Sequence, residues 1–407
     1  MTAPHMELDV LGLLGACSHA LDCVEAELVH VTTFHAKRVA YMSVCTAEQF
    51  GVSGEALQDL AVCALLHDNA LTQYLHEEFR GDSSAAECLP ELPHLGAHCV
   101  MGEENISALP FHTNVENIIL YHHENADGSG SFGKTWQEIP LGARIIRLCD
   151  LLDAFCRADV FTPDVWERAN AFLTRVRGRI VDEECADAFL RAFSEQHFCS
   201  LGGRGLEERL WSKVPRTKQQ LDFAQVKALA KFFAKIVDYK SPFTSTHSLG
   251  VADDAECLAR FMGFDEDTAQ KMYLAGALHD IGKVAIGNEI LEKPGRLTDS
   301  EYAEMKHHAA YTYYVLSEVQ DFAELRDWAA FHHEHLDGTG YPFGKNESEL
   351  NTQERIMACV DIYQALTENR PYKAGMSHEK ACSILLDMAE KGWLDRAIVE
   401  QVNACFA

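Results

Sequence analysis

Five histidines and two aspartates in the C-terminal half of the chain are residue types that bind metal ions, and they stand in short, separated motifs. They are His247, His279, Asp280, His308, His332, His333 and Asp361. Imidazole nitrogens and carboxylate oxygens suit iron, manganese, nickel or zinc better than soft metals. Two divalent cations about 3.5–4 Å apart can bind a phosphodiester, activate a water molecule and stabilise the leaving oxygen. The set therefore predicts a binuclear metallohydrolase.

The same residue types recur in the N-terminal half, in the same order and at offsets of 210 to 212 residues. The matching positions are His35, His67, Asp68, His98, His122, His123 and Asp150. A match at a fixed period indicates two copies of one domain. We therefore predict a first domain at 1–205, a linker at 206–220 that follows the glycine-rich stretch 201–205, and a second domain at 221–407.

The elements that must position these residues are predicted to be helices. Apolar residues between Val226 and Val237 recur at helical spacing, and helical patterns continue through 252–262 and 265–278. Thr298 or Ser300 precedes a glutamate-rich turn, which indicates a helix N-terminus with a capping box. Alternating β patterns are scarce. We predict an all-α fold of two tandem helical bundles, each with a buried metal site where several helices converge.

The C-terminal half resembles the HD-GYP phosphodiesterases, a branch of the HD superfamily that hydrolyses cyclic dinucleotides. The resemblance covers 221–407 and rests on five motifs in the family's order: Thr246-His247-Ser248, His279-Asp280-Ile281-Gly282-Lys283, Met305-Lys306-His307-His308, the stretch from His332 to Pro342, and Asp361 through Arg370-Pro371-Tyr372-Lys373. It implies tandem HD-type domains and an enzyme that opens cyclic di-GMP or 3′,3′-cyclic GMP-AMP to the linear dinucleotide. The nucleophile would be a hydroxide that bridges two metal ions.

The resemblance also implies roles for single residues. One metal ion would be held by His247, His279, Asp280 and Asp361. Asp280 would bridge to a second ion, whose other ligands are His308, His332 and His333. Lys283 would contact a substrate phosphate or donate a proton to the leaving group. Further substrate contacts are expected from Gly340, Tyr341, Arg370 and Lys373. Iron or manganese is the expected metal, and nickel and zinc stay open.

Some positions of the second repeat depart from the family. Phe243 stands where members with a third metal ion carry a carboxylate, so two ions are expected. Gly250 stands where the family usually has Arg, although Arg38 keeps that residue in the first repeat. Gln364 replaces a common Asp three residues after the last ligand. The surroundings of the metal ligands are therefore expected to differ from those of other members.

The first repeat departs further. Leu71 occupies the position of Lys283, and Ser131-Phe132 replaces Tyr341-Pro342. Its candidate metal ligands are nevertheless intact, and such residues are costly to bury without a partner. We expect a domain that binds metal and regulates its neighbour. A structural copy, or a separate activity such as phosphomonoesterase action, stays open.

Composition limits the partners. The chain has 35 Lys and Arg against 62 Asp and Glu, a formal net charge of −27, which disfavours DNA or RNA as a partner because phosphate binding needs clustered basic residues. The 14 cysteines are scattered without a Cys-x-x-Cys motif, which favours reduced thiols in the cytoplasm over disulfides. No uncharged apolar run is long enough to cross a bilayer. We predict a cytoplasmic protein without membrane attachment, and leave its oligomeric state open.

Two other functions stay open. One is an HD-type phosphohydrolase that acts on ordinary nucleotides, which Gly340-Tyr341-Pro342 and the stretch from Arg370 to Lys373 disfavour. The other is a non-catalytic receptor for a cyclic dinucleotide, which the presence of Lys283 beside a complete ligand set disfavours.

Overall fold

The computed structural model describes residues 5–18, 34–71, 73–74, 96–156, 162, 164–203, 205–214, 216–240, 247–291, 293, 295–369 and 374–407. The chain divides into two compact units. We call Val10–Thr217 the first unit, and Lys218–Ala407 together with Met1–Asp9 the second unit. Three residues that the sequence analysis singled out lie outside the described residues. They are Phe243, Arg370 and Lys373.

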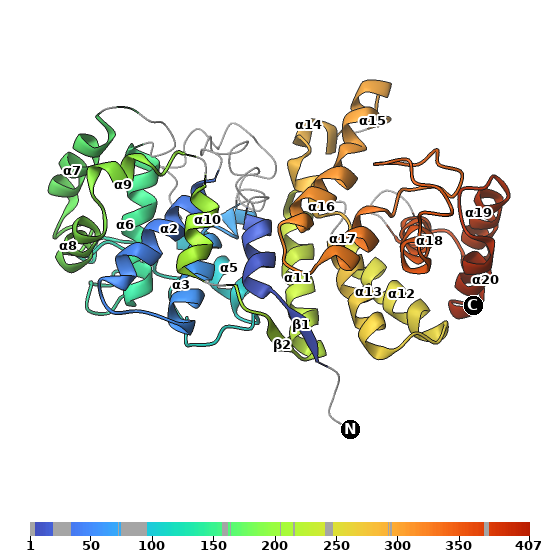
Figure 1. Ribbon diagram of the computed structural model, residues 1–407, viewed down its shortest axis with the longest axis horizontal. Helices are drawn as coiled ribbons and strands as arrows, with labels where there is room; N and C mark the ends of the chain where they lie inside the picture. The colour runs from blue at the N-terminus through green and yellow to red at the C-terminus, as the bar shows by residue number, and fades with distance from the viewer. Residues whose placement is uncertain are drawn as a thin grey trace. The chain divides into compact units, whose positions relative to one another are not determined.

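The first unit is built of helices around α2 (Figure 1). Their bounds are α2 (His35–Glu48), α3 (Glu55–Leu65), α5 (Gly96–Ile106), α6 (Leu141–Cys156), α7 (Val165–Val176), α8 (Glu183–Ala192), α9 (Glu195–Cys199) and α10 (Leu206–Lys213), and residues 10–18 are also helical. Every residue of α2 from His35 to Ala47 is buried, because the helix packs against α3, α6, α8 and α10. His35 therefore lies in the interior of the unit.

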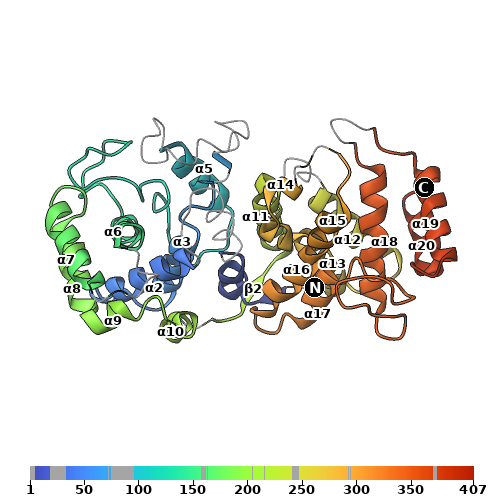
Figure 2. The same cartoon turned by 90° about the horizontal axis from the view of Figure 1, so that it is seen from above.

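The second unit has the same central arrangement, in which α12 packs against α13 and α18, and Figure 2 shows these three helices side by side. Its helices are α11 (Phe223–Lys240), α12 (His247–Phe261), α13 (Glu266–Leu278), the 3₁₀ helix η2 (Ile281–Ala285), α14 (Asn288–Leu291), α15 (Asp299–Met305), α16 (His307–Ser317), α17 (Ala323–Ala330), α18 (Thr352–Thr367), α19 (His378–Glu390) and α20 (Arg396–Cys405). The helix ends, rather than the helix middles, carry most of the candidate ligands.

Side-chain caps define where several of these helices begin. Asp265 accepts a hydrogen bond from the backbone N–H of Thr268 at the start of α13. Thr298 and Glu301 form a reciprocal capping box at the start of α15, which confirms the prediction for this segment. Asn351 and Glu354 form a second box ahead of α18. These contacts satisfy backbone donors that a helix start leaves without partners.

Two features differ from the sequence prediction. Strand β1 (Met6–Leu8) pairs antiparallel with β2 (Gln219–Leu221), so residues near the N-terminus belong to the second unit. The segment 206–220, predicted as a linker, contains helix α10 and strand β2, and Leu210 of α10 is fully buried. Both differences arise from pairing between segments far apart in sequence, which local patterns do not contain.

The predicted all-α fold of two tandem bundles is confirmed, because the ligand-bearing helices of the two units correspond in order. These pairs are α2 with α12, α3 with α13, α5 with α16, and α6 with α18. No helix in the described ranges is both long enough and apolar enough to cross a bilayer.

Candidate metal centre

The ends of four helices and the interior of a fifth bring the candidate ligands of the second unit together. His247 is the first residue of α12, and His279 and Asp280 directly follow α13. His308 lies in the first turn of α16, and Asp361 lies within α18. His332 and His333 follow α17, which ends at Ala330. Apart from His333, these residues are at most 7% exposed, so their polar atoms need partners inside the protein.

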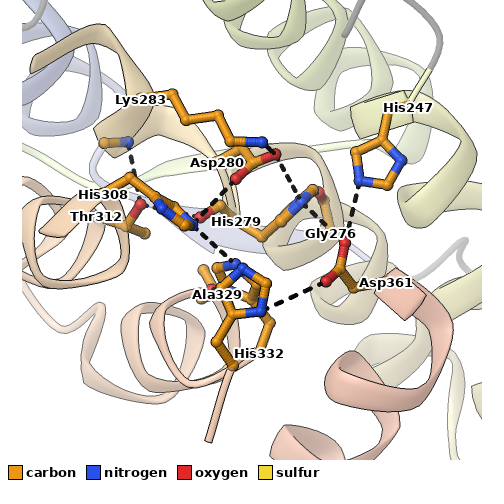
Figure 3. Close-up of polar contacts among 12 residues, drawn as sticks. His247, Gly276, His279, Asp280, Lys283, His308, Thr312, Ala329, His332 and Asp361 are labelled. Carbon is orange, nitrogen blue, oxygen red and sulfur yellow. Dashed lines mark hydrogen bonds and ion pairs between the residues drawn. The ribbon is translucent and has the colours of Figure 1, made fainter. Parts of the chain in front are cut away.

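The first part of this centre lies around Asp361 (Figure 3). Its Oδ1 atom is 3.0 Å from His247 Nε2 and 3.6 Å from His279 Nε2. His279 Nε2 is also 3.1 Å from Asp280 Oδ2. His247, His279 and Asp280 each offer one ligand atom within 4.8 Å of the others. The arrangement leaves one buried point surrounded by nitrogen and oxygen donors.

The second part lies on the other side of Asp280. The Nε2 atoms of His308 and His332 are 3.4 Å apart, and His308 Nε2 is 3.5 Å from Asp280 Oδ1. The ligand atoms of His308, His332 and His333 also lie within 4.8 Å of one another. The two oxygens of Asp280 therefore face the two parts of the centre, as a bridging carboxylate would.

Hydrogen bonding to the backbone sets the tautomers of these histidines. The Nδ1 atoms of His279, His308 and His332 each lie 2.7 Å from a backbone carbonyl oxygen three residues earlier. A carbonyl only accepts, so each Nδ1 must donate, and a neutral ring then has its lone pair on Nε2. Lone pairs of His308 and His332 consequently face each other across 3.4 Å, and His279 Nε2 is buried without a hydrogen-bond partner. This donor set fits divalent cations bound between the residues.

The electrostatics agree with that fit. Burial would raise the pKa of Asp280, but the charges of His279 and Lys283 hold it well below its usual range. Burial lowers the pKa of His308 to about 4 and that of His333 to about 3. Burial would lower the pKa of His279, but the charges of Asp280 and Asp361 raise it. The centre therefore combines an ionised carboxylate with neutral imidazoles at His308 and His333, which are the forms that bind metal ions.

Lys283 points into the same centre (Figure 3). It lies on η2, and its Nζ is 2.5 Å from Asp280 Oδ2. Thr312 of α16 holds this turn in place by donating to the carbonyl of His279 and accepting from the N–H of Gly282. A side chain at Gly282 would collide with the backbone of α16, so the close approach requires glycine. Sequence reasoning missed Thr312, whose role depends on packing between distant segments.

The loop after His333 is held by a buried carboxylate. Glu334 is 2% exposed and accepts hydrogen bonds from the backbone N–H groups of Phe343, Gly344 and Lys345 at 2.7 to 3.1 Å. Glu124 accepts in the same way from Phe132 and Lys134 in the first unit. Glu334 thus organises the loop around the centre.

Gly340 and Tyr341 lie directly against the candidate ligand His333. A Cβ at Gly340 would collide with the backbone of 333–335, so glycine permits this close approach. The N–H of Tyr341 donates to the carbonyl of His333 at 3.1 Å, and the two rings lie 4.7 Å apart between centroids. The bond from Tyr341 to Pro342 is cis. The Gly-Tyr-Pro motif therefore supports the position of His333.

We expect Glu334→Gln to loosen this loop without unfolding the unit. The amide presents an N–H₂ group to backbone donors, which leaves buried groups without partners at a cost of about 1–3 kcal/mol. Amide hydrogen exchange at Phe343 and Lys345 should accelerate on the order of tenfold to a hundredfold. The matched change Glu124→Gln should leave exchange at these two residues unaltered. Unchanged exchange in Glu334→Gln would contradict the proposed clamp.

Gly250 and Gln364 stand at the positions that Arg38 and Asp153 occupy in the first unit, and they lie against each other. In the first unit, Arg38 donates to both carboxylate oxygens of Asp153 at 2.6 and 2.9 Å, and Asp153 contacts His35 Nδ1 at 2.7 Å. In the second unit a side chain at Gly250 would collide with Gln364. The first unit thus has both the arginine and its aspartate partner, and the second unit has neither.

Glu368 is a carboxylate that lies near His247 in the second unit. Its Oε2 atom lies 3.7 Å from Nδ1 of His247, the nitrogen that faces away from Asp361. At this distance the two groups attract each other by charge but do not form a hydrogen bond. Sequence reasoning missed Glu368 because it lies one helical turn beyond the position at which the family carries Asp.

We expect Gly250→Arg alone to destabilise the second unit by about 1–3 kcal/mol, because it overpacks a filled space. The double change Gly250→Arg with Gln364→Asp should recover at least half of that loss, since it recreates the pair found at Arg38 and Asp153. Thermal unfolding of the wild type, both single variants and the double variant measures the coupling. Purely additive effects would show that the two positions are independent.

The first unit brings its own candidate ligands together. His67 Nε2 lies 3.4 Å from Asp68 Oδ2, and the Nε2 atoms of His98 and His122 lie 3.4 and 3.3 Å from Asp68 Oδ1. His35 Nε2 lies 3.5 Å from Asp150 Oδ1. Asp68 thus faces two groups of donors, as Asp280 does in the second unit.

Cys99 also lies in the first unit's centre, and sequence reasoning missed it. Its ligand atom lies within 4.8 Å of those of His98, His122 and His123, and the residue is fully buried. Burial would raise the pKa of the thiol, but His122 and His98 lower it to about 6. The sequence carried one signal, because Cys99 directly follows a candidate ligand.

The amino-acid sequence is similar to those of known proteins. A family model described as the HD domain matches the chain twice, at residues 22–181 and 231–398. The 3′3′-cGAMP-specific phosphodiesterase 1 of Vibrio cholerae is 29% identical over 95% of this chain and 89% of its own length. The 3′3′-cGAMP-specific phosphodiesterase 3 of the same organism is 33% identical over 70% of this chain, which spans 62% of that relative.

One further relative is similar in sequence over a shorter segment, and one solved structure is similar in fold. A cyclic di-GMP phosphodiesterase of Pseudomonas aeruginosa is 38% identical over 34% of this chain and 34% of its own length. The crystal structure of a cyclic GMP-AMP-specific phosphodiesterase of V. cholerae superposes with a TM-score of 0.66 and 24% identity. It covers 99% of this chain and 98% of that one, and at this identity it shows a shared fold.

Proposed function

The chain belongs to the HD domain family, and we propose that its second unit is a metal-dependent phosphodiesterase that hydrolyses a cyclic dinucleotide. The observation that carries this proposal is the pair of imidazole lone pairs facing each other at His308 and His332, beside the ionised Asp280. Such an arrangement favours a bound cation. The family is metal-dependent, and the relatives described above act on cyclic dinucleotides by name.

For the substrate we propose 3′,3′-cyclic GMP-AMP, with cyclic di-GMP as the second candidate. The relative that aligns over 95% of this chain carries the specificity for 3′3′-cGAMP in its name. The relative named for cyclic di-GMP aligns over 34% of the chain. The product would be the linear dinucleotide. Water would attack the phosphorus of one phosphodiester, and the bond from that phosphorus to a ribose oxygen would break.

We further propose that the second unit holds two divalent ions, iron or manganese. The ligands of one would be His247, His279, Asp280 and Asp361, and those of the other would be His308, His332, His333 and Asp280. Bound cations would polarise the phosphodiester and lower the pKa of a coordinated water. The nitrogen and oxygen donors of this set favour such borderline-to-hard metals.

Besides the metal ligands, other side chains of the protein would contribute to hydrolysis by binding the substrate and transferring a proton. We propose that Lys283, whose Nζ lies 2.5 Å from Asp280 Oδ2, contacts a phosphate oxygen or protonates the departing ribose oxygen. Tyr341 lies over His333 and would form one wall for the substrate. The substrate contacts proposed for Arg370 and Lys373 rest on the sequence alone.

We assign hydrolysis to the second unit rather than the first. Leu71, which is 7% exposed, stands where Lys283 stands in the second unit, and a leucine cannot bind a phosphate or donate a proton. The role proposed for the first unit is therefore to stabilise or regulate its neighbour.

Turnover of the wild-type protein tests the proposal. The protein is purified under low oxygen, loaded with Mn²⁺ or Fe²⁺, and incubated with 3′,3′-cyclic GMP-AMP, cyclic di-GMP and cyclic di-AMP. Chromatography should detect linear product that requires metal and disappears with a chelator. Tight binding without product would favour a receptor. Hydrolysis of ordinary nucleotides alone would favour a general phosphohydrolase.

A further inference from the structure

The centre of the first unit contains a sulfur atom where the second unit has none. Cys99 follows His98 on α5, whereas the corresponding residue after His308 on α16 is Ala309. Among the clustered metal-binding residues that the structure describes, Cys99 is the one cysteine. Cysteine thiolate is a soft ligand, which changes both the metal preference and the coordination of the site.

The imidazole of His123 forms a hydrogen bond with Arg147, which is outside the cluster of candidate ligands. An Nη1 group of Arg147 donates to His123 Nδ1 at 2.9 Å. Arginine has no acceptor, so this nitrogen must accept, and the neutral ring then carries its hydrogen on Nε2. The corresponding histidine of the second unit, His333, instead directs Nδ1 toward Asp361 at 3.9 Å. The first unit therefore lacks the third imidazole lone pair at this position.

We propose that the first unit binds a zinc-class divalent ion through Cys99, His98, His122 and Asp68, in a closed tetrahedral site. The distance from Cys99 Sγ to His98 Nε2 is 3.6 Å, and those from Asp68 Oδ1 to His98 and His122 are 3.4 and 3.3 Å. Bond lengths of about 2.3 Å to sulfur and about 2.0–2.1 Å to nitrogen or oxygen give tetrahedral ligand separations of about 3.3–3.6 Å. These three separations match the tetrahedral values, and the ligand atoms of His98, Cys99 and His122 all lie within 4.8 Å of one another.

Charge and coordination number lead to the same site. A thiolate and a carboxylate neutralise a divalent ion, which favours binding beside the buried side chains of His98, Cys99 and His122. Four protein ligands leave no coordination position for water, and closed sites of this kind are structural, whereas catalytic sites keep a position open. This ion would stabilise the first unit without performing hydrolysis, independently of the function proposed for the second unit.

Cobalt substitution tests the sulfur ligand without relying on activity. The full-length protein is stripped of metal and loaded with Co²⁺, and we expect a near-ultraviolet sulfur-to-cobalt charge-transfer band. The band should be lost in Cys99→Ala and retained in the matched variant Cys185→Ala, which removes another buried cysteine of the same unit outside the ligand cluster. A band that persists in Cys99→Ala would overturn the proposal.

A second measurement keeps the proposal testable if Cys99→Ala fails to fold. X-ray absorption at the zinc edge of the zinc-loaded wild type should contain a sulfur scatterer at about 2.3 Å. Only nitrogen and oxygen scatterers would overturn the proposal. Because neither readout uses turnover, an inactive protein with a sulfur-ligated ion would refute the proposed enzyme function alone.

Discussion

Asp280→Asn is expected to lower kcat for cyclic dinucleotide hydrolysis by roughly a thousandfold or more, because the interaction of the reacting groups with bound cations is worth several kcal/mol. Asp280 is the residue whose oxygens face both parts of the centre, 3.1 Å from His279 and 3.5 Å from His308. Asparagine keeps the shape but removes the negative charge that the two parts share. The measurement is the initial rate of linear product formation at saturating substrate, with metal content determined on the same sample.

The matched change in the first unit is Asp68→Asn, which alters the equivalent carboxylate. It should reduce kcat by less than about tenfold, because the barrier to hydrolysis depends on the second unit, and should lower the metal content of the protein. Circular dichroism and thermal unfolding check that both variants fold. An equal loss of turnover in the two variants would show that hydrolysis needs both centres and would contradict the assignment to the second unit.

Lys283→Met is expected to reduce kcat by about 10²–10⁴, the usual contribution of a positioned proton donor or acceptor. Its ammonium group contacts Asp280 and faces the centre, and its side chain is 20% exposed. Methionine keeps the aliphatic chain, so metal content and folding should stay close to the wild type. Lys271→Met is the control, since that lysine lies on the same unit and pairs with Asp267 at 2.7 Å.

Lys283→Arg separates the two roles proposed for this lysine. Arginine retains the positive charge but is not deprotonated in proteins, so it can hold a phosphate and cannot deliver a proton. Substantial recovery of kcat in Lys283→Arg would identify a phosphate contact. A loss as large as that of Lys283→Met, with KM unchanged, would identify proton donation. Full activity of Lys283→Met would remove this residue from the mechanism.

The candidate ligands could be predicted from sequence because their chemistry is a property of residue type and their order repeats along the chain. His247, His279, Asp280 and His308 recur as His35, His67, Asp68 and His98, and the structure brings each set together. The helical fold was also predictable, since apolar periodicity and caps such as Thr298 act within a few residues.

Tertiary structure alone decided which residues surround those ligands. Glu334 and Glu368 acquire their partners only when the loop and α18 fold beside the centre, and the pair of Arg38 and Asp153 joins residues 115 positions apart. The sulfur of Cys99 likewise enters the first centre because α5 turns it inward. Contacts of this kind depend on helix packing, to which local sequence patterns contribute little, so residue type determined the available ligands and packing determined how they are held.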